Sequence, residues 1–216
     1  MLTSSPTKYG AGITLYGDAH DLRALHETIH KIASERHVDE RFRFFMLSLA
    51  YDIRKAYEGA RERKRIGHQK LDWAKYFSVN VLWPFFLPQA ALVRHFAAYY
   101  PTTHRDQACL YLLEDCAITS LLACDANVGK VCSECFLNFP MLSHDYLMEF
   151  FTQCAREFVE FPEKKRFQKL PGILRKLMWL SPEYQAFSKE LAKTAKANDC
   201  GPEELSDPRD WPKFRW

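Results

Sequence analysis

The chain has 216 residues, with 30 Lys and Arg against 27 Asp and Glu, so its formal net charge at pH 7 is +3. Hydrophobic residues make up 47% of the chain and charged residues 26%, which are the proportions of an ordinary globular protein. This composition excludes an intrinsically disordered chain and a collagen-like chain. The small net charge does not by itself indicate a nucleic-acid or membrane partner.

The beginning of the chain predicts a polar leader, a short strand and a helix. Residues 1–11 are polar and lack an apolar signal core, so we expect a flexible leader. Residues 12–17 place β-branched and aromatic residues between glycines, which is typical of a strand. Asp18 then stands where a helix N-cap belongs, and apolar residues recur at steps of three and four from Leu22 to Ile32.

The next segments mix strand and helix patterns. Residues 43–54 carry a nearly continuous apolar run that fits a buried strand or a buried helix, and we expect a strand. Residues 77–83 alternate enough for another strand, which Pro84 would end. The most apolar window, residues 76–99, contains prolines and charged residues, so it predicts protein core and not a membrane span.

The remainder of the chain predicts helices. Thr103 and Asp106 have the spacing of a capping box at the start of one of them. The predicted helices span residues 89–100, 103–123, 130–138, 143–160, 164–179 and 182–198. We therefore expect an α+β fold, in which a small N-terminal antiparallel or mixed sheet precedes a mostly helical remainder. A single domain would cover residues 12–200, followed by an irregular C-terminal tail over residues 201–216.

One catalytic pattern is the H-E-x-x-H formed by His26, Glu27 and His30. On a helix the two histidines share a face and can hold Zn²⁺, while the glutamate acts on the metal-bound water. Ala33 and Arg36 occupy the positions where the longer metzincin pattern has Gly and His. We favour an amphipathic helix with two half-exposed histidines, and keep a zinc-dependent hydrolase as the alternative.

The cysteines suggest a reducing compartment and a second candidate metal site. There are seven of them, an odd number, spread through the predicted helices, which is typical of a cytoplasmic protein with buried thiols. Cys132 and Cys135 form a C-x-x-C pair, and His144 and Cys154 could complete a set of four zinc ligands. Because no second closely spaced pair is present, we favour buried thiols and expect no cofactor, with zinc as the exception.

A basic run raises the alternative of an RNA-binding protein or a HEPN-like ribonuclease. Residues 54–70 are rich in Lys and Arg, and Arg63 and His68 have the R-x4-H spacing of the HEPN class of helical ribonucleases. Gly67 interrupts the segment just before His68. A second basic patch lies within residues 164–176 and could extend the first. We favour solvated charged faces for both.

A polar pocket is a further candidate. Asp18 and His20 follow the first strand, where with Asp21 they could bind a divalent metal. Helix capping explains Asp18 and Asp21 without a metal, and we favour it. If residues 43–54 form a neighbouring strand, Asp52 and Arg54 share one of its faces. Asp52 and Arg54 would then form either a structural ion pair at the sheet edge or, together with Asp18 and His20, the lining of a polar pocket.

Several blocks of the chain resemble an uncharacterised bacterial family of unknown function. They are Gly12-Ile13-Thr14-Leu15-Tyr16-Gly17-Asp18 with Asp21-Leu22, Ala50-Tyr51-Asp52-Ile53-Arg54-Lys55-Ala56-Tyr57-Glu58-Gly59, Leu82-Trp83-Pro84 with Gln89 and Arg94, and Pro101-Thr102-Thr103 with Asp106-Gln107-Ala108. The resemblance covers about residues 9–125. It implies a bacterial cytoplasmic protein without an assigned activity, and it carries over no catalytic residue.

The function that these observations favour is a non-enzymatic, partner-binding protein, of an accessory or immunity type. The catalytic motifs are incomplete, while aromatic residues make up 14% of the chain and suit an interface. Residues 211–216, which include Phe214, lack core periodicity and could dock on another chain. We expect the partner to be another protein or a second copy of the chain, and we expect no membrane association.

Overall fold

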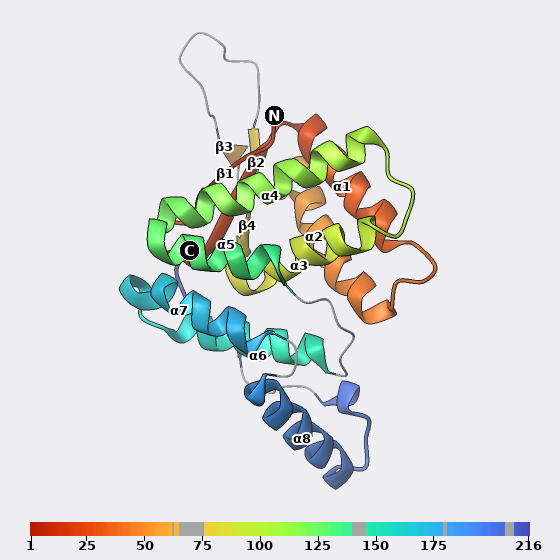
Figure 1. Cartoon of the computed structure of the whole chain (residues 1–216), viewed down its shortest axis with the longest axis vertical. Helices are drawn as coiled ribbons and strands as arrows, with labels where there is room; N and C mark the ends of the chain where they lie inside the picture. Colours follow the sequence, from red (N-terminus) through yellow and green to blue (C-terminus); the bar gives the residue numbers. More distant parts are fainter. Residues whose placement is uncertain (62, 65–75, 140–145, 179–180, 206–209) are drawn as a thin grey trace.

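A computed structural model of the chain describes residues 1–61, 63–64, 76–139, 146–178, 181–205 and 210–216. It has the predicted α+β fold, with a small antiparallel sheet near the N-terminus and helices over most of the remainder. The sheet and helices α1 to α5 form the upper part of the molecule in Figure 1, and α6 to α8 form the lower part.

The sheet has the strand order β1-β2-β4-β3, and every neighbouring pair is antiparallel. Its strands are β1 (Thr3–Pro6), β2 (Gly12–Gly17), β3 (Arg63–Lys64) and β4 (Tyr76–Leu82). In the central pair, Leu15 lies opposite Val79 and belongs with it to the hydrophobic core. On the other face, Thr14 lies opposite Asn80, and its hydroxyl donates a hydrogen bond of 2.8 Å to the Asn80 amide oxygen.

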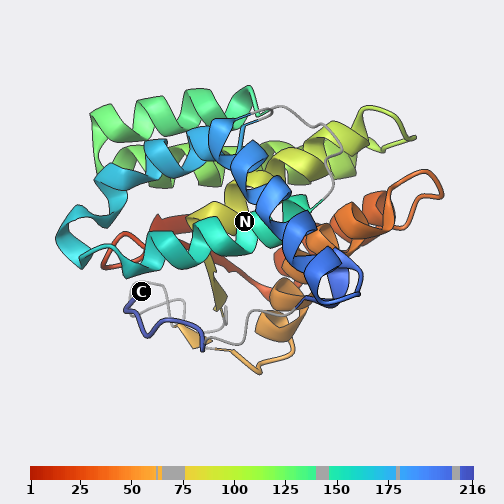
Figure 2. The same cartoon turned by 90° about the horizontal axis from the view of Figure 1, so that it is seen from below.

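Helices surround the apolar face of the sheet and continue below it. They are α1 (Ala19–Ala33), α2 (Glu40–Tyr57), α3 (Trp83–Ala97), α4 (His104–Cys124), α5 (Ala126–Leu137), α6 (Leu147–Glu160), α7 (Glu163–Lys176) and α8 (Pro182–Ala197). Viewed from below, α6, α7 and α8 lie across the helices of the upper part (Figure 2). The largest fully buried side chains include Trp83 and Phe86 of α3 and Phe151 and Phe158 of α6, so one core joins both parts.

Helix α1 begins where the sequence predicts. The Asp18 carboxylate accepts hydrogen bonds of 2.8 Å from the backbone N–H groups of His20 and Asp21, and the Asp21 carboxylate accepts one of 3.4 Å from the Asp18 N–H. This reciprocal capping satisfies amides that the first turn of a helix otherwise leaves free. Thr103 and Asp106 form the same arrangement at the start of α4, as predicted.

The expectation of a strand over residues 43–54 is wrong, because this segment lies within α2. Its buried residues Phe42, Met46, Leu49 and Ile53 recur at steps of three and four. Phe45 lies outside that stripe and packs its ring 5.0 Å from Phe151 of α6. The exposed side of α2 carries the aromatic residues Phe44 and Tyr51, which are 63% and 50% exposed, so its sequence shows no uniformly polar face that would have revealed a helix.

The segment predicted as a flexible leader, residues 1–11, contains β1. Its Ser4 hydroxyl donates to the main-chain oxygen of Cys116 on α4 at 3.0 Å, and Leu2 is only 5% exposed. A polar strand can pair through its main chain and side-chain hydroxyls, so an apolar pattern is not required. Strand β4 falls close to the predicted range, and α3 starts directly after it, with Pro84 in its first turn.

Helix α4 is long and apolar enough to cross a membrane by length and composition, and among the described helices it is the one with that property. A single helix of this kind is weak support for a membrane span, because a core helix of a soluble protein passes the same test. In this structure Leu110, Leu113, Ala117 and Leu121 of α4 are buried.

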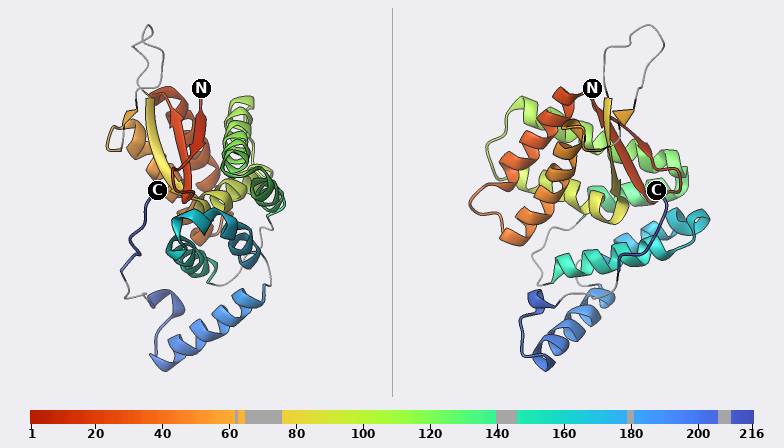
Figure 3. Two further views of the ribbon diagram at one scale, coloured as in Figure 1. Left: turned by 90° about the vertical axis from the view of Figure 1, so that its left-hand side faces the viewer. Right: turned by 180° about the vertical axis from the view of Figure 1, so that it is seen from behind.

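The last described segment, residues 210–216, forms neither helix nor strand and packs on its own chain. The Trp211 ring lies 6.3 Å from Phe85 of α3, and the main-chain oxygen of Trp216 accepts a hydrogen bond of 3.0 Å from the Tyr9 N–H. Figure 3 shows this segment rising from the α8 end of the molecule to the sheet. The aromatic residues of this segment, which we expected to dock on another chain, therefore contact the protein's own chain.

Candidate functional site

The two histidines of the H-E-x-x-H pattern share one face of α1, as a metal site requires. Their ring centroids are 5.9 Å apart, and the His26 ring also meets the edge of Tyr57 on α2. Burial, His30 and Arg54 lower the pKa of His26, so this imidazole is neutral at pH 7. Among the described residues, however, no group of three or more His, Cys, Asp and Glu side chains is arranged to hold a metal ion, and Glu27 is exposed.

The cysteines are free thiols, and burial keeps the candidate ligands Cys132, Cys135 and Cys154 protonated. Burial raises the pKa of Cys132 and of Cys154 to about 12, and burial also raises the pKa of Cys135. A thiol with so high a pKa is a poor nucleophile and binds a metal only after an unfavourable deprotonation. Cys132 and Cys135 lie on α5 and Cys154 on α6, while the fourth candidate ligand, His144, lies outside the described residues.

The candidate pocket of Asp18, His20, Asp52 and Arg54 required a strand over residues 43–54, but these residues lie in helix α2. Two positions apart on α2, Asp52 and Arg54 are separated by roughly 200° around the helix axis. Asp52 forms an ion pair with Arg61, while Arg54 contacts Glu58 and stacks on the Tyr51 ring.

Asp18 and His20 have partners elsewhere. Asp18 caps α1, and the hydrogen bond from the Asp21 N–H is the main reason that its pKa is lowered. The His20 Nε2 lies 3.5 Å from the Arg105 guanidinium on α4. The described contacts therefore do not join these residues with Asp52 and Arg54 into one site.

The basic segments are only partly described. His68 lies outside the described residues, and of Arg63 the structure describes only the backbone. In the second patch, Arg166 is 3% exposed and donates to the main-chain oxygens of Val159 and Arg215, at 3.0 and 2.9 Å. Arg166 is therefore a buried side chain that holds residues 210–216, and it is not part of a solvated basic surface. One arginine within a run of basic residues gives no sequence pattern that would distinguish these roles.

The most developed surface cluster lies where α3 ends and α4 begins. The Arg94 guanidinium donates to both carboxylate oxygens of Glu114, at 2.5 and 3.0 Å, and to the Gln107 side chain at 2.7 Å. Its central carbon lies 4.5 Å from the centroid of the Tyr111 ring. The bidentate pair fixes the arginine, so the guanidinium and the tyrosine ring form a rigid stacked unit.

A second pair of rings lies at the end of α3 and in the turn that follows it. The Tyr99 ring lies 5.2 Å from the His95 ring, and burial lowers the pKa of His95, which keeps the imidazole neutral at pH 7. Tyr99 and Tyr111 are 68% and 64% exposed, among the most exposed large side chains of the described chain. We call Arg94, His95, Tyr99 and Tyr111 the aromatic–arginine surface. No sequence motif marks this surface, because its members come from α3, from the turn after α3 and from α4.

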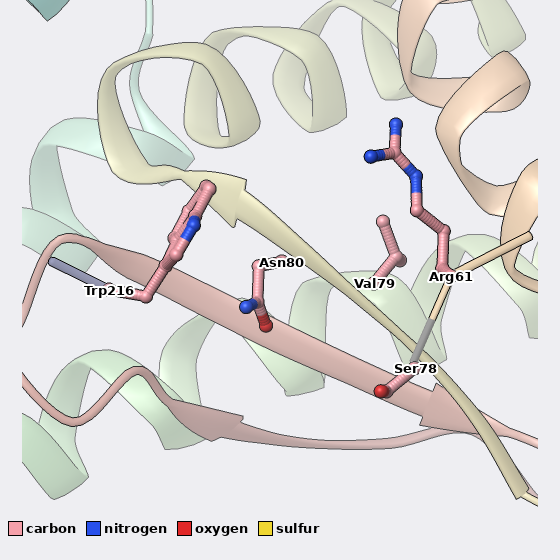
Figure 4. Close-up of a pocket in the computed structure, with 5 residues that line it drawn as sticks. All are labelled: Arg61, Ser78, Val79, Asn80 and Trp216. Carbon is pink, nitrogen blue, oxygen red and sulfur yellow. The ribbon is translucent and has the colours of Figure 1, made fainter. Parts of the chain in front are cut away.

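A small polar cavity lies on the sheet (Figure 4). Arg61 and Trp216 flank the segment of β4 that carries Ser78, Val79 and Asn80. Its volume is about 210 Å³, below the roughly 300–1,000 Å³ of most small-molecule sites. This cavity has room for a small polar molecule, but the described residues that line it include no acid–base pair.

These features define an α+β domain in which the described residues assemble an aromatic surface but no metal centre. The chain belongs to the family described as domain of unknown function DUF6904, which it matches over residues 2–216. The resemblance to an uncharacterised domain family is thereby confirmed over nearly the whole chain. A search of curated proteins and a search of solved structures each found no match.

Proposed function

We propose that the chain is a non-enzymatic, partner-binding protein of the bacterial cytoplasm, whose partner is a protein that docks on the aromatic–arginine surface. The observation that carries this proposal is the exposure of Tyr111, whose ring stacks on an arginine that ion pairing already holds in place. Tyr99, in the turn after α3, is exposed to a similar degree. Tyrosine and arginine are enriched among residues that dominate binding energy at interfaces. A fixed guanidinium also loses little conformational freedom when a partner arrives.

The cytoplasmic location is supported by the state of the cysteines. All seven lie within the described residues as free thiols, and Cys116, Cys132 and Cys154 are buried. Free buried thiols suit a reducing compartment. The alternatives have less support: a zinc hydrolase lacks a third ligand among the described residues, and the residues of the ribonuclease-like pair are only partly described.

The experiment is quantitative affinity capture from the native cells with the full chain and two matched variants. Tyr99→Ser combined with Tyr111→Ser removes both exposed rings of the surface. Phe44→Ser is the control, because Phe44 is equally exposed, at 63%, but lies on α2. The proposal predicts a stoichiometric protein that the wild type and the Phe44 variant capture and the double tyrosine variant loses. Equal capture by all three proteins, or no stoichiometric protein with any of them, would contradict it.

A further inference from the structure

The C-terminal segment is held by two buried arginines of the lower helices. Arg156 of α6 is 8% exposed and donates a hydrogen bond of 2.5 Å to the main-chain oxygen of Asp210. Arg166 of α7, 3% exposed, donates one of 2.9 Å to the main-chain oxygen of Arg215. Both bonds go to the peptide backbone, so they would hold any chain of the same shape.

Each arginine also faces an aromatic ring of the segment. The central guanidinium carbon of Arg156 lies 5.3 Å from the centroid of the Trp211 ring. The corresponding carbon of Arg166 lies 5.9 Å from the centroid of the Phe214 ring. Trp211 and Phe214 are three positions apart with Pro212 between them. In a polyproline-II chain residues three apart share one face, and proline favours that conformation. The rings therefore supply the selectivity that the backbone bonds lack.

The face that holds the segment also has a hydrogen-bond donor and a cavity that the segment does not use. The buried Arg166 Nε has no hydrogen-bond partner among the described residues. A cavity of about 550 Å³ runs beside the segment, lined by residues 159–163, Arg166 and residues 212–215. A buried guanidinium with an unused donor is costly and is relieved by an additional acceptor.

The segment is held in a way that permits release. Residues 210–216 have no helix or strand, and Trp211 and Trp216 each remain 38% exposed. Segments with few ladder hydrogen bonds and little buried area open at low cost compared with global unfolding. A tethered segment nevertheless competes strongly, because its effective concentration is roughly millimolar.

We propose that the α6–α7 face carrying Arg156 and Arg166 is a binding site for an extended, polyproline-II-like segment of a partner protein with aromatic residues three positions apart. Residues 210–216 are the competing intramolecular occupant of this site. The site is separate from the aromatic–arginine surface, and it regulates binding, because a partner segment enters only by displacing the chain's own tail.

The test uses the full chain and a fluorescein-labelled peptide with the sequence of residues 210–216, followed by fluorescence anisotropy. Trp211→Ala with Phe214→Ala loosens the tail of the full chain, and this variant should bind the peptide at least tenfold more tightly than the wild type. Replacing Trp and Phe by Ala in the peptide should weaken its binding to the loosened chain at least tenfold. Equal affinity of the wild type and the loosened chain, or of the two peptides, would overturn the proposal.

Two further experiments test whether Arg156 and Arg166 form the binding site, and whether the bound segment comes from a different protein or from a second copy of this chain. In the loosened chain, Arg156→Lys or Arg166→Lys should each weaken peptide binding at least tenfold, with helicity checked by circular dichroism, whereas Tyr99→Ala should not. Unchanged binding in a folded lysine variant would overturn the site. If a lysine variant does not fold, the peptide comparison above still decides. A wild-type chain that dimerises by exchanging its own tails would overturn the assignment to a separate partner.

Discussion

At the scale of single residues, Asp106 is the most strongly stabilised carboxylate described. Burial raises the pKa of Asp106, but hydrogen bonds from Lys31 and Thr103, at 2.8 and 2.9 Å, lower it to about 2. The ordinary pKa is 3.8, so the group favours folding at pH values above about 4. This contribution, at most about 2 kcal/mol, is lost as the pH falls through the folded-state value near 2.

Asp106→Asn should therefore lower the free energy of unfolding at neutral pH by about 1–2 kcal/mol. The difference from the wild type should shrink as the pH falls towards 2 and below, because Asp106 then becomes protonated and uncharged like the asparagine. Urea unfolding of both proteins between neutral pH and pH 2 measures this difference in the free energy of unfolding. Glu190→Gln, on the exposed face of α8, is the control. A difference that does not change with pH would mean that the hydrogen bonds to Asp106 do not depend on its charge.

The candidate metal residues give a second prediction at this scale. His26 and His30 lack a third ligand among the described residues, and the Cys132 thiol is strongly protonated. We expect less than one zinc per chain after purification without a histidine tag or a chelator, as measured by elemental analysis. One zinc per chain that is lost in His30→Ala or in Cys132→Ala would contradict this expectation and identify the site.

At the scale of elements, the β2–β4 pair depends on a close approach at Gly12. A Cβ added there would lie 2.0 Å from the main-chain oxygen of Val81, well inside a van der Waals contact. Gly12→Ala should destabilise the protein by roughly 3 kcal/mol or more, because the two backbones must separate. Gly172→Ala is the matched control, since nothing lies within 4 Å of its added Cβ and alanine favours a helix by about 1 kcal/mol. Thermal melting that ranks the two variants in the opposite order would contradict this account.

Elements with a local pattern could be predicted, and elements defined by their neighbours could not. Asp18 and Thr103 mark helix starts through side-chain capping, which depends only on residues within one turn. The helix over residues 43–54 was missed because Phe45 faces Phe85 and Phe151 from other helices, which hides the helical period. Similarly, β1 was missed because its stability comes from pairing with β2 and from the contact of Ser4 with α4.

The same distinction explains the candidate sites. The H-E-x-x-H pair lies on one helix, so its shared face could be predicted, but a third ligand depends on tertiary structure. Arg94 and Tyr111 meet only because α3 and α4 pack side by side, with Glu114 and Gln107 fixing the arginine. The buried role of Arg166 depends in turn on the position of the distant tail.

At the scale of the whole molecule, the aromatic–arginine surface is separate from the core. Tyr111 is 64% exposed, whereas Phe158 of α6 is fully buried. Tyr99→Ser and Tyr111→Ser should each change the free energy of unfolding by less than about 1 kcal/mol, while Phe158→Ala should cost about 3–5 kcal/mol. Urea unfolding at neutral pH measures all three. A tyrosine variant as unstable as the Phe158 variant would show that the ring serves folding and not a partner.

The most direct test of partner binding is photocrosslinking from the surface itself, inside the native cells. Benzoylphenylalanine would replace Tyr99, Tyr111 or, as the control, the equally exposed Phe44. Binding through the aromatic–arginine surface predicts one discrete crosslinked product from positions 99 and 111, identified by mass spectrometry, and none from position 44. No product from positions 99 and 111, or the same products from all three positions, would contradict the proposed function.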